Sequence, residues 1–262
     1  KMPEISIGGL AKYDRDNGFN QGAVTLKYAD YKLTQDRGRT FQLDSMDVDE
    51  SNFVASAGNV MGEFQRTQVI PEVDAFRYSK IAALAKDASH ETATFTPDKT
   101  NILEKLDDEI AKVQDIIGEG EPLVVIMATP VRTILNNAKD ITKYLDTADF
   151  KAGEITTKVK TYNEIPILPV PSARMKTAYV FNDGKTAGQE KGGFEPDTAA
   201  KGINWIIIAR RAPIAVSKTD KIRIFEPNVN QKADAWKLDY RKFHDLWIPT
   251  NKLAGVWVNT GE

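Results

Sequence analysis

The stretch GAVTLKYADYKLTQDRGRTFQLDSMDVDESNF, residues 22–53, decides the fold because a strand pattern gives way within it to a helix pattern. Apolar residues first alternate with polar ones on both sides of the turn signal QDRG: Val24, Leu26, Tyr28, Phe41 and Leu43. This alternation predicts one long β-hairpin over residues 22–44. A two-stranded hairpin is marginally stable alone in water, so we expect it to lie on another surface.

Four acids follow the strand pattern: Asp44, Asp47, Asp49 and Glu50. Clustered carboxylates are candidates for a metal or catalytic site, but Asp47 and Glu50 also form a D-x-x-E pattern directly before the helix pattern. The positive end of the helix dipole favours carboxylates at this position. We therefore expect Asp47 and Glu50 to cap a helix and not to form a chemical site.

The apolar residues after the acids recur at helical spacings of three and four: Phe53, Ala57, Val60, Phe64, Val73, Phe76, Ile81 and Leu84. This spacing predicts a helix over residues 51–86, kinked or broken at Pro71, which has no N–H and crowds the carbonyl group of Thr67. At 1.5 Å per residue, such a helix is about 50 Å long. A compact chain of this size has a diameter of only about 50 Å, so we expect a flat, elongated protomer.

The remainder of the chain contains both helices and strands. An amphipathic helix is predicted over residues 101–118, with Gly118 at its C-terminal end, and an apolar strand follows at 122–128. Further strands are predicted within 154–175, at 203–209 and around KIRIFEP, and the last two strands, in WKLDYRKFHDLWIP and GVWV, are expected to pair with each other. Since helices and strands do not alternate as repeated βαβ units, the predicted class is α+β.

Composition excludes several classes of function. The chain has 262 residues, and 41% of them are hydrophobic, which is enough for a real core. A formal net charge of −2 argues against a protein that binds nucleic acid by neutralising phosphates, and no apolar run is long enough to span a membrane. Cysteine is absent, so disulfides, thiolate metal sites and cysteine nucleophiles are excluded.

Three short motifs resemble chemical sites but fail on spacing. GKT lacks the glycine of a phosphate-binding loop, since Tyr179 occupies that position. HETAT, which starts at His90, has Thr94 where a zinc-binding helix needs a second histidine. His244 and Asp245 are neighbours on a predicted strand and therefore point to opposite faces. We expect no catalytic, cofactor-binding or metal-binding residues, and hence no enzyme.

Two groups of basic residues are candidate contact sites. Arg37 and Arg39 flank Gly38 at the tip of the predicted hairpin, and two interpretations stay open: a solvated turn, or a charged tip that docks on a neighbouring subunit. The second group is mixed with Asp220 and is interpreted as a solvated face: Arg210, Arg211, Lys218, Lys221 and Arg223.

The order of these segments resembles the major capsid proteins of tailed bacteriophages and prophages, which have the HK97-type fold. The resemblance rests on a Gly- and Asn-rich lead-in before residues 22–53, then on the helical VMGEFQRTQVIPEVDAFRYSKIA, and finally on KTDKIRIFEPNVNQKADAWKLDYRKFHDLWIPTNKLAGVWV. It covers nearly the whole chain. It lies in the order and spacing of segments and not in a chemical motif.

The resemblance implies a division of the chain. Residues 1–21 would be the remnant of an N-terminal arm, 22–46 an extended loop over the adjacent subunit, 47–98 and 236–262 a peripheral domain, and 99–235 an axial domain that meets its copies at the five- and six-fold axes. The residues of the extended loop expected to contact the neighbour are Tyr28, Tyr31, Arg37, Arg39 and Phe41.

The resemblance also implies a structural function. The chain would self-assemble as pentamers and hexamers into an icosahedral head shell, built in the bacterial host cytoplasm and found in the virion, with packaged DNA enclosed without specific binding. Scaffold, portal or decoration proteins would be further partners, and neither a cofactor nor a membrane would take part. Three alternatives stay open: an encapsulin-like compartment of the same fold, an enzyme with an unrecognised site, and a tail-tube protein, which a long helix fits badly.

Overall fold

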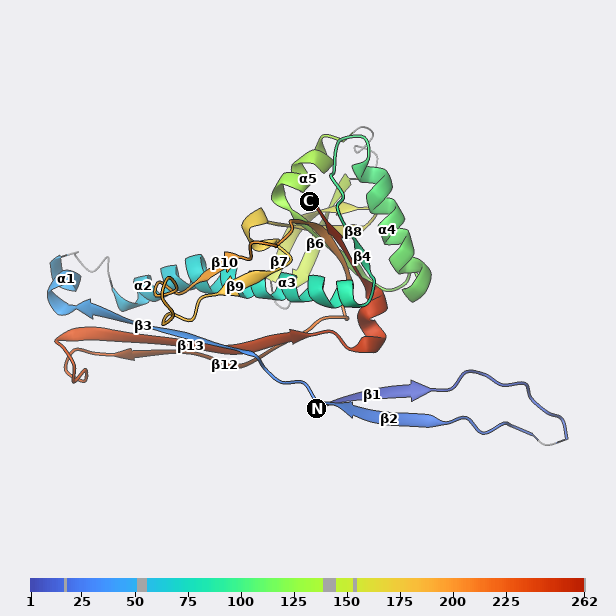
Figure 1. The fold of residues 1–262 in the computed structure, drawn as a ribbon, viewed down its shortest axis with the longest axis horizontal. Helices are drawn as coiled ribbons and strands as arrows, with labels where there is room; N and C mark the ends of the chain where they lie inside the picture. The colour runs from blue at the N-terminus through green and yellow to red at the C-terminus, as the bar shows by residue number, and fades with distance from the viewer. Residues whose placement is uncertain (17, 51–55, 139–144, 153–154, 262) are drawn as a thin grey trace.

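The protein is elongated, with a tapered body, a long flat limb beneath it and a hairpin that projects from the limb (Figure 1). The computed structural model describes residues 1–16, 18–50, 56–138, 145–152 and 155–261. Both helices and strands are present and do not form repeated βαβ units, so the α+β prediction is confirmed. Among the described residues, no helix combines the length and the apolar character needed to cross a membrane.

The body is built on a mixed seven-stranded sheet. Its strands lie in the order β4 (Glu91–Thr92), β14 (Val256–Thr260), β11 (Ile203–Ala209), β5 (Leu123–Ala128), β8 (Ile165–Val170), β7 (Ile155–Tyr162) and β6 (Leu145–Ala152). Every residue of β11 is buried, as expected for a central strand covered on both faces. Short strands β9 (Tyr179–Phe181) and β10 (Phe194–Pro196) form a separate antiparallel pair beside the long helix.

Helices α4 (Ile102–Ile117) and α5 (Thr129–Asn136) pack on this sheet. The predicted apolar stripe of α4 is confirmed, because Ile102, Leu106, Ile110 and Val113 are all buried in the main core. Gly118 ends the helix with a φ of 85°, a conformation that costs glycine little because it has no Cβ. Two short 3₁₀ segments, η3 (Ser172–Arg174) and η4 (Thr250–Gly255), complete the body.

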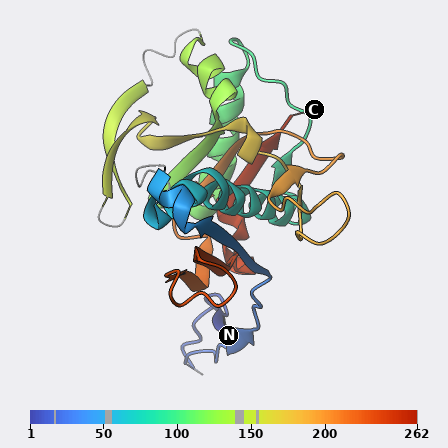
Figure 2. The same ribbon diagram turned by 90° about the vertical axis from the view of Figure 1, so that its left-hand side faces the viewer.

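One long helix runs between the body and the limb (Figure 2). It consists of α2 (Ala57–Phe64), a π-helical segment η1 (Gln65–Val69) and α3 (Ile70–Asp87) without interruption, and we call residues 57–87 the long helix. The predicted break at Pro71 is wrong, because the helix continues through this residue, but a π-helical segment lies directly before it. Since Pro71 has no N–H to donate, the turn before it widens, and the Ile70 N–H reaches back to the carbonyl of Gln65.

The limb is a three-stranded antiparallel sheet that lies along the long helix. Strand β13 (Ala235–Trp247) is central, with β12 (Ile214–Phe225) and β3 (Gln35–Asp44) on either side. A small second core joins this sheet to α2, where Met61, Leu238 and Tyr240 are buried. Helix and sheet are both about 45 Å long at their ordinary rises per residue, which accounts for the flat, elongated shape.

The predicted hairpin over residues 22–44 is wrong. Strand β2 (Val24–Ala29) pairs with β1 (Met2–Ile7), and β3 pairs with β13 instead. Strand β1 lies within residues 1–21, which the resemblance assigned to the remnant of an N-terminal arm, and it supplies half of the real hairpin. Alternation in the sequence identified β2 and the second half of β3, but it does not encode which strand is the partner.

The predicted domain boundary at residues 235/236 does not follow the sheets. The last strand, β14, lies in the seven-stranded sheet between β11 and β4 and does not pair with β13. Val256 and Val258 are fully buried because β14 lies in the interior of the large sheet. Conversely β12, expected in the axial domain, is an edge strand of the limb, and its largely exposed side chains suit that position.

Candidate assembly surface

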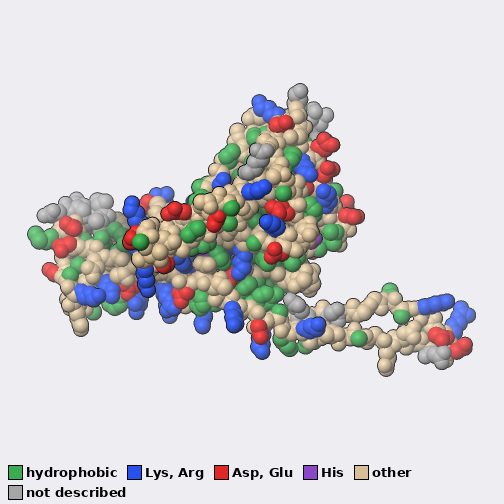
Figure 3. Space-filling model, in the orientation of Figure 1, with side chains coloured by type: hydrophobic (Ala, Val, Ile, Leu, Met, Phe, Trp, Pro, Cys, Tyr) green, Lys and Arg blue, Asp and Glu red, His purple; other side chains and the backbone are tan. Residues whose placement is uncertain are grey.

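The projecting hairpin, residues 2–29, is an antiparallel pair whose register runs from Met2 opposite Ala29 to Ile7 opposite Val24. Its two strands form a sheet of their own. Residues 8–23 connect them at the far end, and the whole hairpin stands clear of the body (Figure 3). A two-stranded ribbon buries little of its own surface, so this hairpin gains almost no stability from the rest of its chain.

One face of the projecting hairpin is apolar. The register places three pairs directly opposite each other on this face: Val24 with Ile7, Leu26 with Ile5, and Tyr28 with Pro3. Residues Thr25 and Lys27 of β2 point to the other face, because side chains alternate along a strand. The ribbon is thus amphipathic, like a strand pair that covers a core, yet neither hydrophobic core found among the described residues includes any of its side chains.

The large apolar side chains of the projecting hairpin are exposed: Ile5, Ile7, Leu10, Tyr13, Phe19, Val24, Leu26 and Tyr28. Phe19, in the connecting loop, is 90% exposed and contacts only the ring of Tyr13 among the described aromatic residues, at 5.0 Å between centroids. Scattered apolar residues on a surface are ordinary, but a contiguous apolar face marks a site that another molecule covers. The hairpin therefore has the chemistry of an interface.

The base of the hairpin is anchored to the limb. The ring of Tyr31 lies 5.3 Å from that of Trp247. Thr34 donates two hydrogen bonds to the same oxygen, Asp245 Oδ2, from its N–H at 3.0 Å and from its hydroxyl at 2.9 Å. Lys80 of the long helix donates to the other oxygen of Asp245. These contacts fix the direction in which the hairpin leaves the body.

The carboxylate of Asp245 is held charged at this anchor. Burial raises its pKa, but the hydrogen bonds from Lys80, from the Leu246 N–H and from Thr34 outweigh burial, so the pKa lies below its ordinary value. As predicted, Asp245 does not orient His244. The sequence offered no signal for its role, because its partners lie 165 and 211 residues away.

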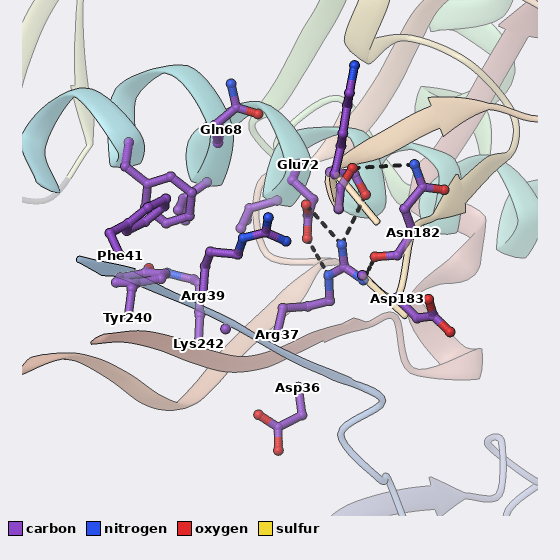
Figure 4. A pocket seen from close by; sticks show the side chains of 18 of the residues that line it. Asp36, Arg37, Arg39, Phe41, Gln68, Glu72, Asn182, Asp183, Tyr240 and Lys242 are labelled. Carbon is purple, nitrogen blue, oxygen red and sulfur yellow. Dashed lines mark hydrogen bonds and ion pairs between the residues drawn. The ribbon is translucent and has the colours of Figure 1, made fainter. Parts of the chain in front are cut away.

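Arg37 holds three segments of one chain together. Its guanidinium donates to both carboxylate oxygens of Glu72, at 2.7 and 3.2 Å, and to the carbonyl oxygens of Asn182 at 2.9 Å and Gly193 at 3.0 Å (Figure 4). Glu72 lies on the long helix, whereas Asn182 and Gly193 lie in the loop between β9 and β10. Paired guanidinium and carboxylate groups of this geometry are the strongest hydrogen-bonded contacts in proteins.

The predicted position of Arg37, Arg39 and Phe41 at a hairpin tip is wrong. QDRG is not a turn but the start of β3, and Gly38 is there for another reason: a Cβ would lie 2.7 Å from the carbonyl oxygen of Tyr240 on β13. Arg39 reaches the carbonyl of the loop residue at position 190, and Phe41 packs edge-on against the long helix. Their contacts lie within the chain. Of the five residues expected at the subunit contact, only Tyr28 lies on the projecting hairpin.

The acids before the long helix cap a different helix from the one expected. A short helix, α1, spans Ser45–Glu50, so Asp44 precedes it and accepts a hydrogen bond from the Met46 N–H at 2.9 Å. Asp47 lies inside the first turn, and its prediction as the cap is therefore wrong; the Glu50 side chain lies outside the described residues. The long helix has its own cap, Ser56, whose hydroxyl accepts from the Asn59 N–H at 3.5 Å.

The described carboxylates of the 44–50 segment were also considered as metal ligands. In the part of the chain that the structure describes, no group of three or more His, Asp or Glu side chains is placed to hold a metal ion. The favourable placement of carboxylates at helix N-termini accounts for Asp44 and Asp47, whereas Asp49 lies in the last turn of α1.

Comparison with solved structures identifies the fold. No protein-family model and no curated protein matches the sequence. A chain from Gordonia phage Cozz matches with a TM-score of 0.63 at 15% identity, over 100% of this chain and 80% of that chain. A chain of the bacteriophage PhiM1 mature capsid gives 0.56 at 12% identity, over 99% and 80%. A chain of the satellite phage P4 procapsid, which includes the size determination (Sid) protein, gives 0.51 at 12% identity, over 99% and 90%.

Identities this low establish a shared fold and nothing finer. The matches span almost the entire chain, and the elongated body, the long helix and the projecting hairpin are all included in that span. The fold that the resemblance predicted is confirmed: the chain has the HK97-type fold found in phage capsids.

Proposed function

We propose that the chain is the major capsid protein of a tailed phage or prophage, a non-enzymatic building block of the head shell. The observation that carries the proposal is the uncovered apolar face of the projecting hairpin on an HK97-type body. An isolated protomer would expose this face to water at a cost of about 25 cal/mol per Å² of apolar surface. Assembly with a second copy removes the cost.

The hairpin and the surface that receives it differ, so the contact is heterologous. Contacts of this kind generate rings when the rotation between copies closes, and pentamers and hexamers are such rings. The shell would enclose packaged DNA without specific binding, which a chain of net charge −2 suits. The chain would then belong to the virion after assembly in the bacterial cytoplasm.

The sheets suggest a revised division of the chain. Residues 1–34 would form the extended loop over the adjacent copy. The limb sheet with the long helix would form the peripheral domain, and the seven-stranded sheet with α4 and α5 would form the axial domain. The Sid protein in the matched P4 procapsid supports an accessory partner such as a scaffold. An encapsulin-like compartment is not favoured, because the matched shells described above come from phages.

Electron microscopy of the purified chain tests the proposal. We expect closed shells from the full chain, and soluble, folded protomers with an unchanged circular dichroism spectrum of the body after deletion of residues 1–29. Closed shells from the deletion variant would show that the projecting hairpin is not needed for assembly. A full chain that stays monomeric at every concentration would contradict the proposed function itself.

A further inference from the structure

A cavity of about 440 Å³ lies between β3, the long helix and the loop that joins β9 to β10, residues 182–193 (Figure 4). Its volume is within the range of small-ligand sites. The proposed shell function assigns no role to it. The residues that decide its chemistry are the charged ones and a buried histidine: Asp36, Arg37, Arg39, Glu72, Asp183, Lys191, Lys242 and His244. Arg37 and Lys242 are paired with Glu72 and Asp220.

The acids that line the cavity are already engaged elsewhere. Glu72 binds Arg37 through both carboxylate oxygens. Asp183 accepts hydrogen bonds from backbone N–H groups of its own loop, which with a threonine hydroxyl lower its pKa to about 2. Asp36 points away from the cavity (Figure 4) and pairs with Arg241. None of them neutralises the remaining cations of the cavity.

Two cations of the cavity have no acidic partner. Arg39 and Lys191 form no ion pair with any residue in the part of the chain that the structure describes. The loop makes room for the guanidinium of Arg39: a Cβ on Gly192 would lie 3.0 Å from Arg39 Nη1, and one on Gly184 would lie 3.5 Å away. The two glycines thus leave space for the guanidinium of Arg39, which donates to a loop carbonyl oxygen but has no acidic partner.

A buried polar atom at the cavity also lacks a partner. His244 is 3% exposed and lines the cavity, and its Nδ1 makes no hydrogen bond. Only Arg77 Nε shares this condition among the buried side-chain atoms that the structure describes. Buried polar groups are nearly always paired, and an unpaired one costs free energy that a ligand can recover.

We propose that this cavity binds an oxyanion, a carboxylate or a phosphate, held by the guanidinium of Arg39, the ammonium of Lys191 and the imidazole of His244. Guanidinium and oxyanion match in shape and charge and form paired hydrogen bonds, and the ammonium adds a second charge. The neutral imidazole donates one hydrogen bond, from whichever ring nitrogen carries its proton. The anion can be free in solution, or it can be a side-chain carboxylate of a neighbouring copy.

Equilibrium dialysis against radiolabelled inorganic phosphate, at ionic strength held constant with chloride, tests the site. We expect saturable binding of one phosphate per chain, competition by acetate, and affinity about tenfold weaker in Arg39→Gln and in Lys191→Gln. The matched control is Arg66→Gln, which removes an exposed arginine paired with Glu63 on the same helix and should bind like the unaltered chain. Lys191→Gln changes an exposed loop residue, so it remains informative even if Arg39→Gln fails to fold.

The source of the anion follows from comparing the unassembled chain with shells. Phosphate binding by the protomer but not by shells means that a neighbour's carboxylate fills the cavity on assembly, and binding by both means that a free oxyanion occupies it. Absence of saturable binding, equal competition by chloride, or unchanged affinity in both variants would overturn the proposal. None of these results bears on whether the chain forms shells.

Discussion

Leu26 and Ile5 face each other across the projecting hairpin, and their side chains are 52% and 59% exposed. Directly opposed apolar residues are the usual unit of sheet stabilisation, but here they also form the middle of an uncovered apolar face. The pair links a local feature of the sequence, the alternation in VTLKYA, to the proposed contact with a second copy of the chain.

Leu26→Asp should abolish shell formation and leave the protomer folded. A carboxylate on the apolar face would be buried without a partner on assembly, and that costs several kcal/mol. Electron microscopy and circular dichroism together check both parts of the expectation. Thr25→Asp is the matched control, since Thr25 is the neighbouring residue on the opposite face, and it should still form shells. Loss of shells in both variants would point to charge repulsion and not to the apolar face.

Arg37→Gln should destabilise the protomer by about 1.5–3 kcal/mol, because it leaves a partly buried Glu72 and two carbonyl oxygens without their donor. Urea unfolding, followed by tryptophan fluorescence, measures the difference. Arg66→Gln removes an exposed ion pair and should change the free energy of unfolding by under about 1 kcal/mol. Equal effects of the two substitutions would mean that Arg37 does not hold the loop to the helix.

Two glycines should respond to alanine with opposite signs. Gly38→Ala places a Cβ 2.7 Å from the carbonyl oxygen of Tyr240, so it should cost about 1–3 kcal/mol through displacement of β3 from β13. Gly58 lies in α2 with nothing within 4 Å of its added Cβ, and Gly58→Ala should stabilise by up to about 1 kcal/mol. Thermal unfolding of both variants checks the signs, and a tolerated Gly38→Ala would disprove the close approach.

Acid should destabilise the protomer through His244 before it affects the carboxylates. Burial lowers the pKa of His244 to about 4, with Arg77 and Lys242 adding to the effect. Between this pKa and the unfolded value of about 6.5, the unfolded chain binds more protons, so stability falls as the pH falls. The loss from pH 7.5 to 5 should be about 2 kcal/mol in urea unfolding. His244→Gln should remove most of this slope, and an unchanged slope would assign it to other groups.

The sequence predicted the positions of most helices and strands described here, but it did not predict which strands pair with each other. The stripe of α4, the apolar strands β5 and β11 and the long helix follow from periodicity, which is local. The pairing of β3 with β13 joins residues about two hundred positions apart, and nothing in QDRG distinguishes a turn from a strand with one glycine at a close approach. Even the cap was displaced by three residues, from Asp47 to Asp44, because D-x-x-E does not fix where a helix begins.

The sequence predicted a projecting hairpin as the candidate interface, but it assigned the hairpin to the wrong pair of strands. A marginal hairpin was expected, but the partner strand came from residues 2–7, which the resemblance assigned to the remnant of an N-terminal arm. Arg37 was expected between subunits because its charge stood at a supposed tip. Its contacts with Glu72, Asn182 and Gly193 lie 35, 145 and 156 residues away, and no local pattern encodes them.

Hydrogen exchange of the amides in Val24–Ala29 tests the central claim most directly, namely that the projecting hairpin becomes ordered against a second copy. In the unassembled protomer these amides should exchange rapidly, since the two-stranded ribbon opens with little cost in free energy. In assembled shells they should be strongly protected, while the amides of β11 stay protected in both states. Equal exchange of Val24–Ala29 before and after assembly would contradict the account.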